Sequence, residues 1–408
     1  MPVMLRVFLA ILALAMPSSL RADDAEPDAP KPATVVVAFD RDSITPLIVE
    51  GFRNFDSLEP VQANDPVRIA SISKLIMALA TLRLVDEGKV DLDADVSEYL
   101  GFTVRSPNFP DTPVTLAQLL SHRAGLRDRA GYIIPLGESL EAKLADTEAW
   151  YADAPPGDAP FEYANLGSPV VATALEAATG ERYDKLLERT VFAPLGVKAC
   201  VNWVGCSDDM VSRAVALYRH TGEPARDYPG DLPPGCSIPV AEGVECSLED
   251  YVPGTNASVF SPQGGVRVGM VDLAKIGQGL WKEGFLSATT AELFFSVDQG
   301  EGRTEGQEFF CHYYLGLQLI NRTLNRCKDN LFGQLSDAIT AFGHSGEAYG
   351  LQSGLWLLSE GAGFVYFRTQ VAPPAGGEDT GGFVQGEKDL MKRAQAALAA
   401  IKTKQESD

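Results

Sequence analysis

The chain has 408 residues, of which 45% are hydrophobic, and its formal net charge at pH 7 is −21. A chain of this length and composition can bury a large core, which excludes disorder as a description of the whole. The acidic surface repels nucleic acid and anionic lipid, and no basic cluster in the sequence offsets it. We therefore expect neither a nucleic-acid partner nor adhesion to a membrane surface.

The first 22 residues predict export. Arg6 precedes an apolar run, and Pro17 and small residues up to Ala22 follow it, a pattern typical of a secretory signal peptide, although Leu20 departs from the small residue usual before the cleavage site. The alternative is a membrane anchor, but the run is shorter than the roughly 20 apolar residues that a span needs. We expect a periplasmic or secreted protein without a membrane span after cleavage. Residues 23–32 are acidic and proline-rich, which indicates a flexible linker.

Strand signals lie at both ends of the remaining chain, residues 33–408. In "ATVVVAFDRDSITPLIVEGF" two β-branched runs flank a turn, which predicts a hairpin, and "GLQSGLWLL" and "GFVYFRTQ" predict two late strands. A final helix carries one apolar stripe, expected to pack on the core, made by Leu390, Met391, Ala394, Ala397, Leu398 and Ile401. We expect one antiparallel sheet built from residues 33–70 and 260–408.

Helical signals fill the region between, residues 71–259. "VTLAQLLSHRAGL" begins with Thr115 and Gln118 in capping-box positions and is predicted to end at Gly125. "SPVVATALEAATG" is predicted to end at Gly180. Residues 198–256 are rich in proline, glycine and cysteine, which predicts loops. The ligand site of such an architecture is expected in the cleft between the sheet and the helical region.

Six cysteines, all in the second half of the chain, fit disulfides in an oxidising compartment. Closeness along the chain favours three pairs: Cys200 with Cys206, Cys236 with Cys246, and Cys311 with Cys327. No Cys-x-x-Cys pair indicates zinc, and no other feature indicates a cofactor. The loops between Cys200 and Cys246 either cover the cleft or brace the surface, and both alternatives stay open.

Ser71 and Lys74, in "RIASISK", are three residues apart at the start of an apolar helix, so their side chains share one face. A serine hydroxyl becomes a nucleophile when a nearby base takes its proton, and a lysine can be that base when burial lowers its pKa. The alternative is that Ser71 only caps the helix. A lysine on so apolar a helix nevertheless needs a buried partner.

Two further segments offer such partners. Tyr163 and Asn165, in "FEYANLG", precede a helix. A tyrosine near a lysine can exist partly as phenolate and shuttle the proton of the serine, while an asparagine can bind an amide. His344, in "FGHSGEAYG", is predicted in a loop just before the strand "LQSGLW", where the following backbone can bind an oxyanion. Each segment alone is also compatible with a structural role.

Together and in this order, "RIASISK", "EYANLG" and "GHSGEAYG" resemble the motifs of the class C β-lactamase-like serine hydrolases. That family includes penicillin-binding D-alanyl-D-alanine carboxypeptidases, D-aminopeptidases, family VIII esterases and class C β-lactamases. The flanking "VTLAQLLSHRAGL", "VFAPLGV" and "SPQGGVRVGMVDLAKIGQGLW" are similar to family segments as well. The resemblance runs from about Ala33 to Gln370 and implies an α+β fold of the β-lactamase/transpeptidase type. The cysteine-bearing loops interrupt it and are not recognised as a family feature.

The resemblance also implies roles for these residues. Ser71 would be the acylated nucleophile, Lys74 its proton partner and Tyr163 the general acid/base. Substrate would be bound by Asn165, His344, Ser345 and Gly346, with His344 alternatively supporting Tyr163. The backbone N–H groups of Ser71 and Glu347 would form the oxyanion hole.

The implied activity is hydrolysis of small esters or D-amino-acid peptides through an acyl-enzyme. A β-lactamase is an alternative: Tyr163 to Asn165 matches those enzymes, whereas their Lys-Thr-Gly motif is replaced here by His344, Ser345 and Gly346. A Ser-His-Asp hydrolase is disfavoured because no Gly-x-Ser-x-Gly occurs. An alternative of another class is a catalytically silent module that binds peptidoglycan or a partner. The sequence does not indicate an oligomeric state.

Overall fold

The computed structural model describes residues 30–225, 236–298, 303–304, 307–320, 327–333, 340–359, 361–372 and 382–407. The predicted signal peptide and most of the predicted linker lie outside these ranges. Described residues from Lys31 onward group into one compact unit. No helix of the described ranges combines the length and the apolar character that crossing a membrane would take.

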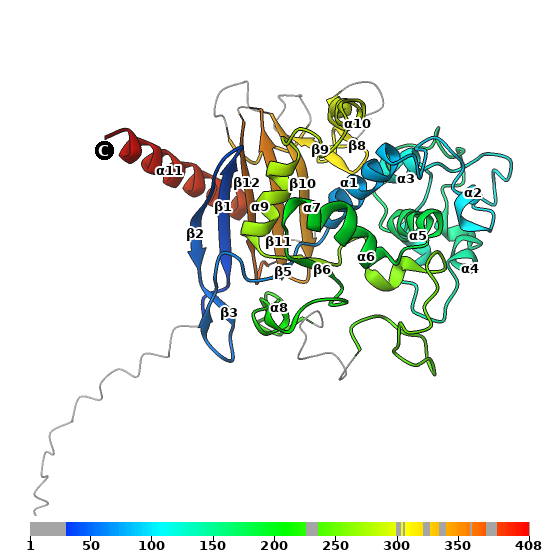
Figure 1. Cartoon of the computed structure of the whole chain (residues 1–408), viewed down its shortest axis with the longest axis horizontal. Coiled ribbons are helices and arrows are strands. Elements are labelled where there is room, and N and C mark those ends of the chain that lie inside the picture. Colours follow the sequence, from blue (N-terminus) through cyan, green and yellow to red (C-terminus); the bar gives the residue numbers. More distant parts are fainter. Residues whose placement is uncertain are drawn as a thin grey trace, which may run out of the picture. The chain divides into compact units, whose positions relative to one another are not determined.

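A seven-stranded antiparallel sheet is the main layer of this unit, with strand order β2-β1-β12-β11-β10-β9-β8 (Figure 1). The predicted hairpin is confirmed as β1 (Thr34–Asp40) and β2 (Ile44–Glu50), and the two late strands as β11 (Leu351–Leu358) and β12 (Ala362–Arg368). β1 pairs with β12, so the two ends of the chain meet in one sheet as predicted. The remaining strands are β8 (Tyr313–Tyr314), β9 (Leu317–Ile320) and β10 (Ala341–Ala348).

Both faces of the sheet are covered, which explains the continuous rather than alternating apolar pattern of β1. Helix α9 (Met270–Gly279) packs on one face, and α11 (Gln385–Ser407) packs on the other. The apolar stripe of α11 is confirmed as a core contact for Leu390, Met391 and Ala394, which are buried against the sheet. Its remaining members, Ala397, Leu398 and Ile401, are partly buried.

The inserted region is less helical than predicted. Its two long helices are α1 (Ile72–Asp86) and α5 (Gly167–Thr179), and α5 ends at Gly180 as predicted. The shorter helices are α2 (Ser97–Leu100), α3 (Leu116–Leu120), α4 (Leu140–Leu144), α6 (Tyr183–Leu187), α7 (Ala193–Leu195) and α8 (Asp208–Ser212). Single turns are η1 (Asp128–Ala130), η2 (Thr147–Ala149), the π-helical η3 (Glu188–Phe192) and η5 (Ala257–Phe260). After this region come α10 (Ala288–Phe294) and η6 (Phe295–Asp298).

Helix α3 has the predicted capping box, in which Thr115 and Gln118 each bind the backbone of the other. It ends at Leu120 rather than at Gly125, because His122 adopts a left-handed conformation with φ of 54°. This early end turns the buried His122 ring toward Tyr163, with ring centroids 4.4 Å apart.

Two small sheets complete the fold. One joins β3 (Phe52–Asn54) to β4 (Glu59–Pro60), and the other has the order β5-β7-β6, with β5 (Val67–Arg68), β7 (Val266–Val268) and β6 (Ala199–Val201). Strand β5 of the second sheet lies just before α1 in the chain, and its Val67 pairs with Val268 of β7, so this sheet fixes the entry of the chain into α1.

Candidate active site

Ser71 lies at the first turn of α1 and faces a cavity of about 440 Å³. Its backbone is already helical, with φ of −65° and ψ of −9°, and its side chain makes no capping hydrogen bond. The preceding Ala70 has a left-handed φ of 47°, an uncommon conformation for a residue other than glycine. The hydroxyl of Ser71 is therefore not engaged with the helix end and is presented to the cavity.

The amine of Lys74 contacts Ser71 and two fixed acceptors. Its Nζ lies 2.8 Å from Oδ1 of Asn165, 3.1 Å from the carbonyl oxygen of Gln263 and 3.2 Å from Oγ of Ser71. Lys74 is 2% exposed, and this burial lowers its pKa to about 7 although Asp128 opposes the shift. A neutral amine has two N–H groups, which can be donated to Asn165 and Gln263. Its lone pair then points to the Ser71 hydroxyl.

Asn165 is held from its other side by Asp128, a residue that sequence reasoning missed. Nδ2 of Asn165 donates to Oδ2 of Asp128 at 2.8 Å, and the N–H of Leu166 donates to Oδ1 at 2.9 Å. Asp128 therefore fixes the amide so that its oxygen faces Lys74. No motif in the sequence indicates this contact, since Asp128 lies in the turn η1, 37 residues before Asn165.

Tyr163 closes the group of polar side chains at Ser71. Its hydroxyl hydrogen-bonds Ser71, and the ammonium position of Lys74 lies 4.7 Å from the centre of its ring. Burial raises the pKa of Tyr163 above its usual value, while the contact with Ser71 opposes the shift. The phenol is therefore protonated near neutral pH, which suits a proton donor better than the partly ionised tyrosine expected from the sequence.

The structure places His344 away from the cavity surface. It lies within β10 rather than in a loop before a strand, is completely buried and is absent from the cavity lining. Its Nε2 lies 3.0 Å from the hydroxyl of Tyr313, and its Nδ1 lies 2.5 Å from the carbonyl oxygen of Ser345. Burial lowers its pKa to about 3, so the ring is neutral. This position does not allow the direct substrate contact expected of it, but it is compatible with support of Tyr163, whose ring centroid lies 6.2 Å away.

The residues that follow His344 do line the cavity. β9 pairs with β10 only from Ala341 to Gly343, and beyond that point Ser345, Gly346 and Glu347 border the cavity together with Ser71. The backbone groups predicted to form the oxyanion hole, those of Ser71 and Glu347, therefore belong to the same cavity. Their role as its donors stays a prediction.

Gly346 is required by the close approach of β10 to α1. A Cβ at this position would lie 2.4 Å from the carbonyl oxygen of Ile69 and 2.4 Å from Oγ of Ser353. We expect Gly346→Ala to push β10 away from Ser71, with a loss of about 1–3 kcal/mol in the free energy of unfolding and a clear loss of activity. Denaturant unfolding of this variant and of Gly167→Ala would check it. At Gly167 the nearest atom to a new Cβ is 3.6 Å away, so that variant should be tolerated.

An aromatic wall that sequence reasoning missed lines the same cavity as Ser71. We use this name for Phe309, Phe310 and Phe383, all of which line the cavity. Phe310 stacks on Tyr163 with ring centroids 4.6 Å apart and planes 7° apart, and Phe309 packs edge-on against Phe383 at 5.0 Å. Other lining side chains are Arg68, Tyr132, Ile133, Gln263, Tyr349, Gln352 and Glu387. The wall joins segments more than 70 residues apart, which no local pattern could indicate.

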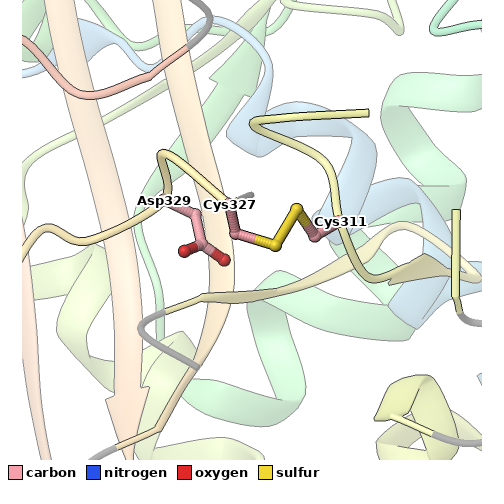
Figure 2. Close-up of side chains that lie close together, drawn as sticks. All are labelled: Cys311, Cys327 and Asp329. Atoms are coloured by element: carbon pink, nitrogen blue, oxygen red, sulfur yellow. A yellow bond between two sulfur atoms is a disulfide. The ribbon is translucent and has the colours of Figure 1, made fainter. Parts of the chain in front are cut away.

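The structure contains the three disulfides favoured from the sequence: Cys200–Cys206, Cys236–Cys246 and Cys311–Cys327. No described residue between Cys200 and Cys246 lines the cavity, whereas the two residues before Cys311 do. Cys311 and Cys327 also form, with Asp329, the one group of potential metal ligands found in the described part of the chain (Figure 2). Because the two sulfurs are bonded to each other, neither is a thiolate that could bind a metal ion.

Comparisons with known proteins agree with this architecture. Residues 24–385 match a family model described as Beta-lactamase. The chain therefore belongs to the beta-lactamase family of serine hydrolases. It is 31% identical over 160 residues to the D-alanyl-D-alanine-carboxypeptidase/endopeptidase AmpH of Escherichia coli (strain K12), covering 36% of this chain and 40% of that protein. It is 28% identical over 208 residues to the esterase EstB of Burkholderia gladioli, covering 48% and 51%.

Solved structures show the same fold at low sequence identity. The D-amino acid amidase of Ochrobactrum anthropi SV3, complexed with L-phenylalanine, aligns with a TM-score of 0.62 at 19% identity and covers 91% of this chain and 94% of that one. A class C beta lactamase of Rhodobacter sphaeroides aligns with a TM-score of 0.61 at 16% identity, covering 91% and 95%. The matches to the two curated relatives span about half of those proteins or less, so activity does not transfer from them directly.

Proposed function

We propose that the protein is an exported hydrolase that cleaves small esters or D-amino-acid amides and peptides through an acyl-enzyme on Ser71. The observation that carries the proposal is the contact set of Lys74. Two fixed acceptors, Asn165 and Gln263, take both N–H groups of the neutral amine and leave its lone pair for the Ser71 hydroxyl. A serine so placed is activated for attack.

The reaction then follows from the positions of the side chains. Lys74 takes the proton as Oγ of Ser71 bonds to the substrate carbonyl carbon, and the N–H groups of Ser71 and Glu347 stabilise the oxyanion. Tyr163, which is protonated near neutral pH, donates a proton to the leaving group as its bond to the carbonyl carbon breaks. Lys74 then returns its proton to the tyrosine. Hydrolysis reverses these steps with water in place of the leaving group. Tyr163 passes its proton to Lys74 and takes one from water as the water oxygen bonds to the acyl carbon, and Lys74 protonates Oγ of Ser71 as the acyl bond breaks and the acid product leaves.

The comparisons support the substrate class. Relatives and structural neighbours carry the names carboxypeptidase, esterase and D-amino acid amidase. Hydrolysis of β-lactams is the second candidate, favoured by the Tyr163 to Asn165 motif. Against it stands the lack of a cation in the third motif, where His344 is neutral and buried. Export is proposed from residues 1–22, and the three disulfides support it because they form in oxidising compartments.

Labelling with a fluorophosphonate tests the nucleophile. We expect intact mass spectrometry to detect one adduct, and tryptic digestion to place it on the peptide from Ile69 to Lys74. This peptide has two serines, Ser71 and Ser73, which fragmentation distinguishes. Labelled Ser71 would support the hydrolase, and a screen of p-nitrophenyl esters, D-amino-acid amides and a chromogenic β-lactam would then rank the substrates. An unlabelled protein would instead favour a catalytically silent binding module.

A further inference from the structure

The proposed reaction requires the hydroxyl of Tyr163 to stay close to Ser71. The residue lies in a loop before α5, and the ring is held by its neighbours. Phe310 is the one parallel-stacked partner among the described rings, with planes 7° apart, whereas His122 and Tyr313 meet it at 38° and 87°. Phe310 therefore covers a flat face of Tyr163 on the side of the cavity that it lines.

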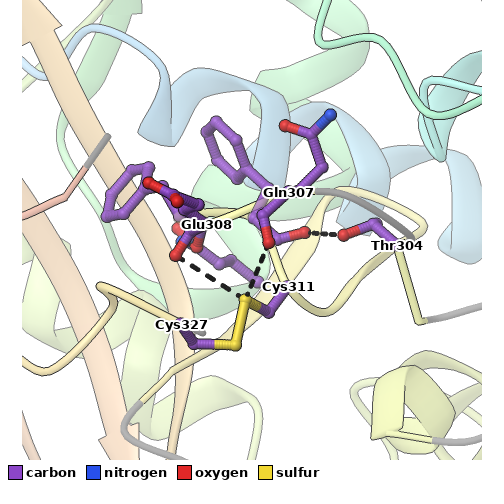
Figure 3. Close-up of a disulfide and its surroundings, with 8 residues drawn as sticks. Thr304, Gln307, Glu308, Cys311 and Cys327 are labelled. Carbon is purple, nitrogen blue, oxygen red and sulfur yellow. Dashed lines mark hydrogen bonds between the residues drawn. A yellow bond between two sulfur atoms is a disulfide. The ribbon is translucent and has the colours of Figure 1, made fainter. Parts of the chain in front are cut away.

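Phe310 itself lies outside any helix or strand, so its own position needs an explanation. Hydrogen bonds to backbone carbonyls hold the segment 307–311. The hydroxyl of Thr304 donates to the carbonyl oxygen of Phe310, the N–H of Thr304 donates to the carbonyl oxygen of Cys311 at 3.0 Å, and Nε2 of Gln318 donates to the carbonyl oxygen of Phe309 at 3.1 Å (Figure 3). Sγ of Cys311 also lies 3.2 Å from the carbonyl oxygen of Gln307 and 3.6 Å from that of Glu308. These last two are polar contacts, since a disulfide sulfur has no proton to donate.

The Cys311–Cys327 disulfide anchors this segment directly after Phe310. It connects to the residues around Cys327, where the N–H of Lys328 donates back to the carbonyl oxygen of Glu308 and the two side chains form an ion pair. The segment is thus closed on itself beside the cavity. Loss of the bond would remove the covalent tie next to Phe310. Among the described residues, the segment would then be held by the hydrogen bonds of Thr304, by that from Nε2 of Gln318 to the carbonyl oxygen of Phe309 at 3.1 Å, by the Lys328–Glu308 contacts and by ring packing.

We infer that Phe310 is a positioning residue for Tyr163 and that the Cys311–Cys327 disulfide holds it in place. The inference rests on the proposed function, in which Tyr163 transfers protons. It assigns to this disulfide a role in catalysis that Cys200–Cys206, which does not border the cavity, lacks.

A pH profile separates positioning from a merely structural role. Removal of Phe310 admits water to Tyr163, which lowers its pKa toward the ordinary value of about 10. Because the donor must be protonated, the rate should then fall at a lower pH than in the parent. The titratable or charged groups that face Tyr163 are Lys74, His122, Asp128, Tyr313 and His344. Burial depresses the pKa values of the lysine and both histidines and raises that of Tyr313, so none of those four supplies a limb near pH 10.

The experiment compares Phe310→Ala, Phe310→Tyr and the double variant Cys311→Ser/Cys327→Ser with a matched control, Cys200→Ser/Cys206→Ser. We expect Phe310→Ala to lower kcat/KM for a short-chain alkyl ester about tenfold or more and to bring an alkaline limb near pH 10, because an alkoxide, unlike the fluoride of a fluorophosphonate, needs a proton to leave. Phe310→Tyr should keep the rate and the pH profile of the parent. Cys311→Ser/Cys327→Ser should show part of the rate loss and part of the alkaline limb of Phe310→Ala. The control pair should leave the rate and the profile unchanged.

Two outcomes would overturn the inference alone. In the first, the parent is labelled by the fluorophosphonate, but Phe310→Ala has the same rate and pH profile as the parent. In the second, Cys311→Ser/Cys327→Ser and the control Cys200→Ser/Cys206→Ser have the same rate and pH profile. A parent that does not label would overturn the proposed function and this inference with it. The melting temperature of every variant shows whether a lower rate comes from a defect in folding. If Cys311→Ser/Cys327→Ser does not fold, Phe310→Ala still decides the inference.

Discussion

Replacing Ser71 by alanine is expected to lower kcat/KM at least about a thousandfold, which corresponds to roughly 4 kcal/mol of transition-state stabilisation. The reason is that, among the described residues, no other serine or threonine hydroxyl both lines the cavity and hydrogen-bonds Lys74, with Tyr163 as the proposed proton donor beside it. Stability should change little, because the Ser71 side chain caps no helix. The measurement is hydrolysis of a p-nitrophenyl ester together with denaturant unfolding.

Ser73→Ala is the matched control, and it should give the opposite signature. Ser73 is completely buried, and its hydroxyl accepts a hydrogen bond from the N–H of Val266 at 3.1 Å. Its loss leaves that buried N–H unpaired and should cost about 1–3 kcal/mol of unfolding free energy, while labelling of Ser71 persists. Equal activity losses in the two variants would contradict the assignment of the nucleophile.

Lys74 gives the second large effect, together with a pH dependence. Its pKa is lowered to about 7, so it is protonated and without a lone pair at lower pH. The rate of fluorophosphonate labelling should therefore fall about tenfold per pH unit below that value and level off above it. Lys74→Met should lower the rate by about a hundredfold to ten-thousandfold at every pH. Lys74→Arg should do the same, because a guanidinium stays charged.

Lys275→Met serves as the control for loss of a lysine. Its ammonium pairs with Asp272 at 2.6 Å on α9, and it does not line the cavity with Ser71. Its rate and pH profile should match those of the parent. An acid limb that survives in Lys74→Met would show that another group is the base.

Local patterns were sufficient to predict much of the fold. The hairpin of β1 and β2, the strands β11 and β12, and the cap of α3 each depend on residues within about 20 positions. β10 was missed because "FGHSGEAYG" has three glycines and no β-branched residue, a composition that indicates a turn. It is a strand because β11 pairs along its whole length, a contact that its own sequence does not indicate.

The candidate site was predicted where motifs are contiguous and missed where it depends on distant contacts. Ser71, Lys74, Tyr163 and Asn165 come together as expected, but Asp128 and Phe310 carry no signal of their own. The protonation of Tyr163 was also missed. A nearby lysine favours an ionised tyrosine in sequence reasoning, whereas burial, which only the structure reveals, disfavours it.

The three disulfides span only 6, 10 and 16 positions of the chain, and all six cysteines are used in them. None links the seven-stranded sheet to the helical region, so the two meet across a seam held by packing and by hydrogen bonds such as that from the N–H of Leu315, between β8 and β9, to Oγ of Ser121. Ser71, the proposed nucleophile, lies on this seam and shares the cavity with Ser345, Gly346 and Glu347 of β10. An acyl group bonded to Ser71 and packed against β10 would add contacts between the two halves, so a long-lived acyl-enzyme should resist heat better than the free protein. Inhibitors could then be ranked by melting temperature without any chromogenic substrate.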